Sequence, residues 1–210
     1  MHSNPFLQTF ALKGLKVILP ILAYGHAILR QKCRPVTKDD PELNVLIDHM
    51  WETMNGANGC GLAAPQIGEP ITLFIVDSQS TFENCEPQER SLYFPAEDEG
   101  IRETFINARI INRTSEAWED EEGCLSIPHL SRKVKRPWTI EVEYMDRQFI
   151  THLKTFSGMT ARMIQHEYDH TQGILYLDYI QPLTRKLMES KLRKISKGQI
   201  RANYPMRYKK

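Results

Sequence analysis

The chain has 210 residues, of which 41% are hydrophobic and 25% are charged, and its formal net charge is +1. This size and composition suit one domain with a core large enough to be stable without cross-links. The sequence contains no apolar run of the roughly 18 to 20 residues that a membrane helix needs, which excludes a protein that crosses a membrane by helices. The four cysteines show no paired spacing, which argues against an export route and predicts a cytoplasmic location.

The chain begins with an extension and a short apolar segment. Residues 1–16 are expected to be an N-terminal extension, and residues 17–23 are apolar and follow two lysines. Such a stretch is similar to a secretion signal, but Pro20 interrupts it and no convincing cleavage site follows. We therefore interpret residues 17–23 as the first packed segment of the domain.

A helix is predicted after residue 40. Asp39 or Asp40 can cap its N-terminus, and Pro41 suits its first turn. Its apolar residues recur at helical spacing and are Leu43, Leu46, Ile47 and Met50. We interpret this stripe as core, because the apolar face of such a helix packs inward.

Four strands follow, and a polar insertion separates the first two. The apolar pattern predicts strands at 71–77, 105–112, 138–145 and 148–155. Residues 78–104 are polar and acidic. They form either a solvated surface loop or one border of a substrate groove.

A second helix carries the motif His-Glu-Tyr-Asp-His, which begins at His166 and ends at His170. Ser157 can cap this helix, and Gly173 lies just beyond its end. Residues four apart lie on the same helix face, so the two histidines can bind one metal ion while Glu167 faces a water molecule there. The spacing predicts a hydrolytic metal site. The alternative is an ordinary polar helix face.

A catalytic site of this kind usually takes three protein ligands, so a third ligand is needed. Cys124 lies in a glycine-containing loop, where the backbone can approach a metal closely. Cys33 and Cys85 lie in basic and polar surroundings, and we interpret them as ordinary free thiols. The economical ligand set is therefore one cysteine and two histidines.

A third segment, residues 59–66, reads Gly-Cys-Gly-Leu-Ala-Ala-Pro-Gln. Its small residues allow a substrate backbone or another strand to come close, and the Gln66 amide can donate a hydrogen bond to a developing oxyanion. By itself such a segment is typical of a turn after a helix. We interpret Cys60 as a small packing residue rather than a ligand.

Taken in order, the three segments resemble the motifs of the bacterial-type peptide deformylases. The matching residues are 59–66, 122–126 and 165–170, and only Tyr168 departs, where an aliphatic residue or methionine is common. The resemblance covers roughly residues 17–185. It implies an α+β fold, with mixed and antiparallel sheets packed around a central metal-binding helix.

The resemblance also implies a role for each matched residue. Glu167 would be the general base and acid. The Gln66 side chain and the backbone N–H of Leu125 would polarise the formyl oxygen of the substrate. The metal ligands would be Cys124, His166 and His170.

The implied reaction removes the N-formyl group from the initiator methionine of nascent polypeptides and releases formate. The expected substrates are therefore N-formylmethionyl peptides. Gly61 would lie beside the substrate, and Met163, together with Met159, would line the pocket for the methionine side chain.

Metal identity depends on the resemblance more than on the ligands. One thiolate and two imidazoles suit iron, zinc, cobalt or nickel by ligand softness. The resemblance implies Fe2+ as the physiological metal, with Zn2+, Ni2+ and Co2+ as possible substitutes.

The last 26 residues, 185–210, predict a basic helix and tail, which leaves residues 17–184 as the catalytic domain. They hold ten of the 27 lysines and arginines and one of the 26 acidic residues, a net charge of +9. Because nascent chains emerge from the ribosome, this charge favours salt-dependent binding to ribosomal RNA or the ribosomal surface. The alternative is a solvated helix followed by a disordered end.

Two other classes of protein share part of this pattern. A zinc endopeptidase has the same histidine spacing but usually takes its third ligand from His, Asp or Glu, so Cys124 and Gln66 argue against it. A metal-stabilised binding module without catalysis would close the fourth coordination position with a further protein ligand, and no motif offers one. We therefore predict a metal-dependent amide hydrolase.

Overall fold

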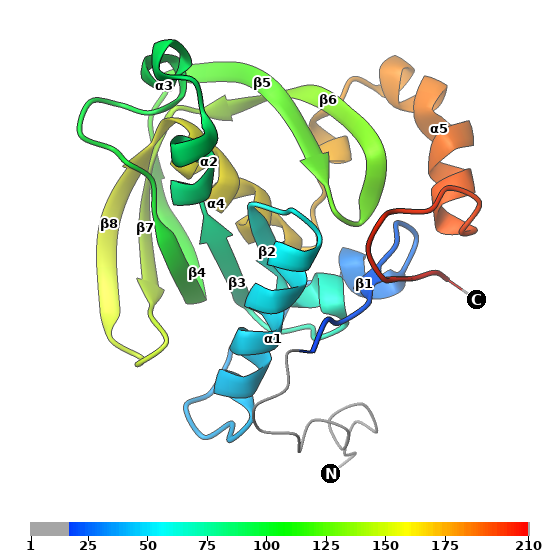
Figure 1. Ribbon diagram of the computed structural model, residues 1–210, viewed down its shortest axis with the longest axis horizontal. Coiled ribbons are helices and arrows are strands. Elements are labelled where there is room, and N and C mark those ends of the chain that lie inside the picture. The colour runs from blue at the N-terminus through cyan, green and yellow to red at the C-terminus, as the bar shows by residue number, and fades with distance from the viewer. Residues whose placement is uncertain (1–16, 210) are drawn as a thin grey trace.

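The computed structural model describes residues 17–209, so the extension expected at residues 1–16 lies outside the described part. Its strands form three sheets, with helices packed against them (Figure 1). The largest sheet has the order β2-β3-β4-β7-β8, and every neighbouring pair in it is antiparallel. This arrangement confirms the predicted α+β fold. The strands of this sheet are β2 (Gly61–Ala63), β3 (Leu73–Asp77), β4 (Arg102–Arg113), β7 (Thr139–Met145) and β8 (Thr151–Ser157).

The four predicted strands all form, although their ends differ from the prediction. The starts of β4 and β8 differ most, each by three residues: β4 begins earlier, at Arg102, and β8 begins later, at Thr151 rather than at Gln148. The Asp146 carboxylate accepts hydrogen bonds from the backbone N–H groups of Gln148 (2.8 Å) and Ile150 (3.0 Å). These bonds close a tight turn, and the strand starts only after it.

Helix α4 (Gly158–Thr171) lies near the middle of the molecule and packs against β2, β3 and β8 (Figure 1). Ala161 and Ile164 on this helix are fully buried in a cluster with Phe74 and Phe105 of the sheet. The two phenylalanine rings stack with their centroids 4.8 Å apart. This packing stabilises the helix that carries the histidine motif.

The two ends of α4 differ in how far they follow the prediction. Ser157 precedes the helix, but its hydroxyl bonds to the Thr139 hydroxyl (2.7 Å) instead of capping a backbone N–H. Gly158 must be a glycine, because it has a φ of +58° and a Cβ there would lie 2.2 Å from the Tyr93 carbonyl oxygen. At the other end, Gly173 has a φ of +74° and terminates the helix as predicted.

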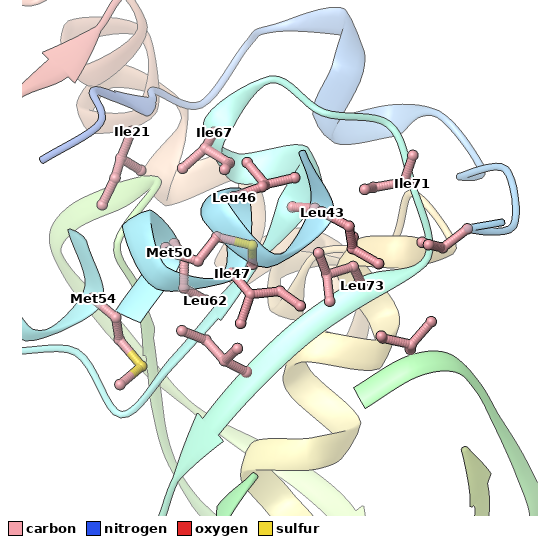
Figure 2. Close-up of a cluster of buried hydrophobic side chains, with 14 of the residues drawn as sticks. Ile21, Leu43, Leu46, Ile47, Met50, Met54, Leu62, Ile67, Ile71 and Leu73 are labelled. Atoms are coloured by element: carbon pink, nitrogen blue, oxygen red, sulfur yellow. The ribbon is translucent and has the colours of Figure 1, made fainter. Parts of the chain in front are cut away.

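A second core lies between α1 (Leu43–Gly56), β2 and β3 (Figure 2). The predicted apolar stripe of α1 is buried, which confirms its role as core. The helix starts later than predicted, because the Asp40 carboxylate accepts the N–H of Glu42 (3.0 Å) in a local turn before the first helical residue. The side chains that meet in this core include Ile47, Met50, Leu62 and Leu73.

The polar insertion folds into two short helices, α2 (Gln79–Asn84) and α3 (Pro87–Tyr93). The Ser78 hydroxyl anchors its start, because it bonds to the Thr160 hydroxyl of α4 (2.9 Å) and accepts the N–H of Ile101 (2.9 Å). The insertion therefore packs onto the helix that carries the motif.

The sequence pattern missed one long hairpin, formed by β5 (Ala117–Cys124) and β6 (Ile127–Pro137). Its register places acidic residues opposite basic ones, with Glu119 facing Lys135 and Glu121 facing Lys133. Opposite charges across a ladder stabilise a strand pair without apolar alternation. Strands are predicted from sequence by alternation of apolar and polar residues, so the charged pattern here does not indicate a hairpin.

The C-terminal part packs into the same body. Helix α5 (Pro182–Ser196) buries Met188, Leu192 and Ile195 against β6 and the short helix η4 (Tyr176–Tyr179). Strand β9 (Met206–Arg207) pairs in parallel with β1 (Ile21–Leu22), so the two ends of the described chain lie side by side (Figure 1). Two further short helices are η2 (Ala27–Arg30) and η3 (Ala64–Ile67). Across residues 17–209, no helix has both the length and the apolar character needed to cross a membrane.

Candidate metal centre

Three predicted ligand residues converge where β5 meets α4. Cys124 is the last residue of β5, and His166 and His170 lie one turn apart on α4. One ligand atom from each lies within 4.8 Å of the other two, and the Cys124 Sγ to His170 Nε2 distance is 3.3 Å. Ligand atoms around one tetrahedral ion are about 3.3 to 3.6 Å apart, given ordinary metal–ligand bond lengths. The three side chains can therefore bind one ion.

The two imidazoles differ in charge before a metal binds. Although burial alone lowers it, the pKa of His166 lies well above its usual value because of hydrogen bonds with Cys124 and Glu122, so metal binding must displace a proton from this ring. His166 Nδ1 lies 3.1 Å from Glu122 Oε2, which leaves Nε2 directed at the centre. Burial holds the pKa of His170 well below its usual value, so this ring stays neutral, as ligation requires. His170 Nδ1 is buried and has no hydrogen-bond partner within the described part of the chain.

A buried network of ion pairs holds His166 on the Nδ1 side of its ring, away from the metal-binding centre. Glu122 accepts two hydrogen bonds from the Arg136 guanidinium (2.8 and 2.9 Å) and one from Arg162 (2.6 Å). Arg136 also bonds to Asp169 of the motif helix (2.5 Å). Although burial alone raises it, the pKa of Glu122 falls well below its usual range because of the hydrogen bonds from Arg136 and His166. Glu122 is therefore a charged acceptor that orients the imidazole.

Glu167 faces the same centre from the next position of the helix. Its side chain is buried, and its Oε2 atom has no hydrogen-bond partner among residues 17–209. Burial raises its pKa to about 7. A Cβ on Gly61 would lie 2.5 Å from Glu167 Oε1, so only glycine at that position leaves room for the carboxylate. An unpaired buried carboxylate beside three ligand atoms fits a site that holds a cation and water.

The amide group of Gln66 is oriented by the backbone of its own segment. Gln66 Oε1 accepts the N–H of Ala63 (2.8 Å), so the amide NH2 points the other way. That NH2 donates to the Ser126 hydroxyl (3.3 Å) and to Cys124 Sγ (3.5 Å). Leu125 directly follows Cys124 and lines the same pocket. Two donors, one amide and one backbone N–H, thus lie next to the ligand group.

These residues open into a pocket of about 560 Å³. Met159 and Met163 of α4 line it, as do Leu125 and Ile127 of the hairpin, which gives it an apolar side. A second pocket of about 600 Å³ adjoins it, and the two share Asn58, Gly59, Cys60 and Met159. The insertion lines this second pocket through Ser80, Thr81, Asn84, Cys85 and Tyr93.

Seven of the eight predicted site residues line one pocket, and the eighth, His170, contacts it through Cys124 Sγ at 3.3 Å. The site also includes residues that sequence reasoning missed. Arg136 and Arg162 belong to the buried ion network, and nothing in their sequence context distinguishes them from surface arginines. Glu122 and Asp169 lie inside the matched motifs, and this position could have predicted that they hold the metal-ligand residues in place. The chain near the C-terminus also lines the pocket, at Ala202, Asn203 and Tyr204.

The fold and the site together define a class. A helix with a His-Glu-x-x-His motif, a cysteine from a neighbouring strand and an open apolar pocket are the features of a metal-dependent hydrolase.

The chain belongs to the polypeptide deformylase family, whose model matches residues 18–186. A peptide deformylase from Christiangramia forsetii is 44% identical over 192 residues, which cover 91% of this chain and 96% of that protein. The crystal structure of a peptide deformylase from Ehrlichia chaffeensis aligns with a TM-score of 0.75 and 29% identity over 87% of this chain and 99% of the other. A peptide deformylase from Acinetobacter baumannii with bound Met-Ala-Ser aligns with a TM-score of 0.68 and 31% identity, over 79% and 100%.

Family membership confirms the predicted class of enzyme. The chain is a hydrolase of a metal-dependent family that removes the N-formyl group from nascent polypeptides. The endopeptidase alternative is not favoured.

Proposed function

We propose that deformylation takes place at the centre formed by Cys124, His166 and His170, which hold a divalent metal ion. The observation that carries this proposal is the convergence of the three ligand atoms within 4.8 Å, next to the unpaired carboxylate of Glu167. When bound, the ion lowers the pKa of a water molecule and polarises the formyl oxygen.

The protein groups around the ion divide the remaining work. Glu167 accepts a proton from the attacking water and later passes it to the departing amine. Gln66 Nε2 and the Leu125 N–H donate hydrogen bonds to the formyl oxygen as negative charge develops on it. Because Ala63 and Ser126 hold the Gln66 amide in place, this donor needs little reorganisation during the reaction.

We propose N-formylmethionyl peptides as the substrates. Met163, together with Met159, forms an apolar wall that can take the methionine side chain, and Gly61 lines the same pocket, where we place the substrate beside it. The related enzyme from Acinetobacter baumannii binds Met-Ala-Ser, a peptide that begins with methionine.

Formate release from a short formyl-methionyl peptide tests this assignment. The protein is purified without oxygen and loaded with Fe2+, and the bound metal is measured before the assay. We expect turnover that is lost in Glu167→Ala while the metal content stays the same. Equal turnover by this variant would show that Glu167 is not the general base. No turnover by the metal-loaded wild type would contradict the proposal as a whole.

We further propose Fe2+ as the physiological metal, with Zn2+, Ni2+ and Co2+ as possible substitutes. The mixed ligand set of one thiolate and two imidazoles suits all four ions, so the assignment follows the family resemblance. In air, the Fe2+ enzyme should lose activity, and the Cys124 thiolate should be open to oxidation because it lines an open pocket. Undiminished activity of the Fe2+ form after hours in aerobic peroxide would argue against iron.

We also propose that residues 17–184 perform catalysis in the cytoplasm while the basic residues 185–210 bind the ribosome. Lys186, Arg193 and Lys194 are exposed on α5, as are the apolar side chains of Leu183 and Leu187. The variant Lys186→Gln, Arg193→Gln, Lys194→Gln removes positive charge and leaves the buried face of α5 intact. We expect weaker, less salt-dependent co-sedimentation with ribosomes and unchanged turnover of short peptides. Equal co-sedimentation at low salt would exclude this surface.

A further inference from the structure

The C-terminal segment, residues 199–209, turns back from α5 towards β1 (Figure 1). It reaches the edge of the active-site pocket. Its strand β9 pairs with β1, and the backbone N–H groups of Ile21 and Ala23 donate to the carbonyls of Pro205 and Arg207 (both 2.9 Å). This pairing places Ala202–Tyr204 along the pocket wall. The family match ends at residue 186, so this wall lies beyond the part of the chain that defines the family.

A second set of bonds ties the segment to the β5–β6 hairpin. His129 Nε2 lies 3.0 Å from the carbonyl oxygen of Arg201, and the Lys191 ammonium of α5 donates to the carbonyl of His129. His129 itself has a φ of +59°, a conformation that few non-glycine residues adopt. The segment is therefore held from both sides of the pocket, by β1 and by β6.

Tyr204 makes the contact that matters for the chemistry. Its half-buried ring packs against the α1 core, and its hydroxyl donates to the backbone carbonyl of Leu125 (2.8 Å). The next carbonyl, that of Ser126, accepts the N–H of Tyr24 (2.8 Å), which lies two residues after β1. Both carbonyls that follow Cys124 are thus held by residues close to the paired strands β1 and β9.

These bonds constrain the orientation of the Leu125 N–H. The N–H and the carbonyl of one residue belong to two rigid peptide planes joined only by rotations about the Cα of that residue. When the carbonyl side is held by Tyr204 and the preceding Cys124 is held as a metal ligand, the N–H has little freedom left. A donor that stabilises an oxyanion must be oriented before the reaction, because reorientation in the transition state adds to the barrier.

We propose that Tyr204 is a positioning residue, which holds the Leu125 backbone so that its N–H meets the formyl oxygen, and that residues 202–204 form one wall of the peptide groove. This inference rests on the proposed role of the Leu125 N–H. Residues 202–204 thus complete the active site of the catalytic domain, in addition to the ribosome binding proposed for the basic residues of 185–210.

Tyr204→Phe tests the hydroxyl alone, because the ring and its packing remain. We expect kcat for a short formyl-methionyl peptide to fall roughly fivefold with KM changed less than about twofold, as for loss of one hydrogen bond that matters in the transition state. The affinity for the product peptide Met-Ala-Ser should stay the same, because the product has no formyl oxygen. The matched control is Tyr208→Phe, whose ring lies against Gly198 of the same segment and which should keep the wild-type kcat.

Tyr204→Ala tests the wall, since it removes the ring as well, and it should raise KM in addition to lowering kcat. A wild-type kcat in Tyr204→Phe would overturn the inference. A fall in kcat matched by an equal loss of affinity for Met-Ala-Ser would also overturn it, because it would indicate a loosened pocket. A wild-type enzyme that releases no formate would contradict the proposed function itself. The two failures are therefore distinguishable.

Discussion

Helix α4 and the C-terminal segment reach the same pocket by different routes. On α4, the two histidines and Glu167 lie within five consecutive residues, and helix geometry alone places His166 and Glu167 each one turn from His170. The C-terminal segment arrives from the far end of the chain, and its position depends on pairing with β1 and on bonds to β6. The first region concentrates chemistry in a local motif, whereas the second positions groups that belong to other segments.

This difference predicts separate effects on activity and on stability. Changes on the pocket face of α4 should alter the reaction with little effect on the free energy of unfolding. Changes in the supporting network and at the C-terminal anchors should alter stability or alignment instead.

The largest effect is expected for Glu167→Gln. This substitution keeps the shape of the side chain but removes its ability to accept a proton, so kcat should fall roughly a thousandfold. The metal content should stay the same, and the melting temperature should not fall, because the neutral amide replaces a buried carboxylate that has no hydrogen-bond partner for Oε2 among the described residues. A large loss of stability in this variant would break the distinction between the two regions.

Arg136→Ala should mainly cost stability. The substitution leaves Glu122 with fewer partners and Asp169 without its charged donor, both buried, and removal of one member of such a buried pair typically costs about 3 kcal/mol. Chemical denaturation measures the change in the free energy of unfolding. Arg132→Ala, an exposed arginine on the same strand, is the matched control and should change it by less than about 0.5 kcal/mol. Similar values for both variants would show that the network does not support the site.

Gly61→Ala should have an intermediate effect on activity. The added methyl group would collide with the Glu167 carboxylate, and relief of such overpacking typically costs about 1 to 3 kcal/mol. We expect kcat/KM to fall at least roughly tenfold, because Glu167 must move away from the centre. Wild-type kinetics for this variant would mean that the carboxylate has an equally productive second position.

The smallest effect is expected at the base of α5. Asp178 bonds to Arg30 and to Arg185, and although burial alone raises its pKa, the hydrogen bond from Arg30 lowers it below its usual value. A lowered folded-state pKa means that the stabilisation is complete above about pH 4, the ordinary value for aspartate, and is lost as the pH falls through the folded-state pKa. Asp178→Asn should lower the free energy of unfolding by less than about 1 kcal/mol at neutral pH. It should also make the free energy of unfolding less dependent on pH in the acid range. Chemical denaturation at pH 7 and at pH 3 measures both effects. An unchanged pH dependence in the variant would show that the ion pairs of Asp178 do not stabilise the fold.

The sequence predicted the parts of the site that lie in short motifs. The three ligands, Glu167 and Gln66 were found because each lies in a segment with a characteristic local pattern, and the structure brings them together. The apolar stripe of α1 and four of the five strands of the main sheet followed from periodicity. The β5–β6 hairpin did not, because β5 is a charged strand without apolar alternation, and its acidic residues face basic residues of β6.

The sequence by itself determined the class of chemistry, since helical spacing and ligand type are local properties that need no knowledge of the rest of the chain. Only the tertiary structure decided which groups support that chemistry. Arg162 reaches Glu122, and Tyr204 reaches the Leu125 carbonyl, through contacts between segments far apart in the chain. Such contacts depend on how strands pair and helices pack, and a single charged or aromatic residue in the sequence carries no record of its partner.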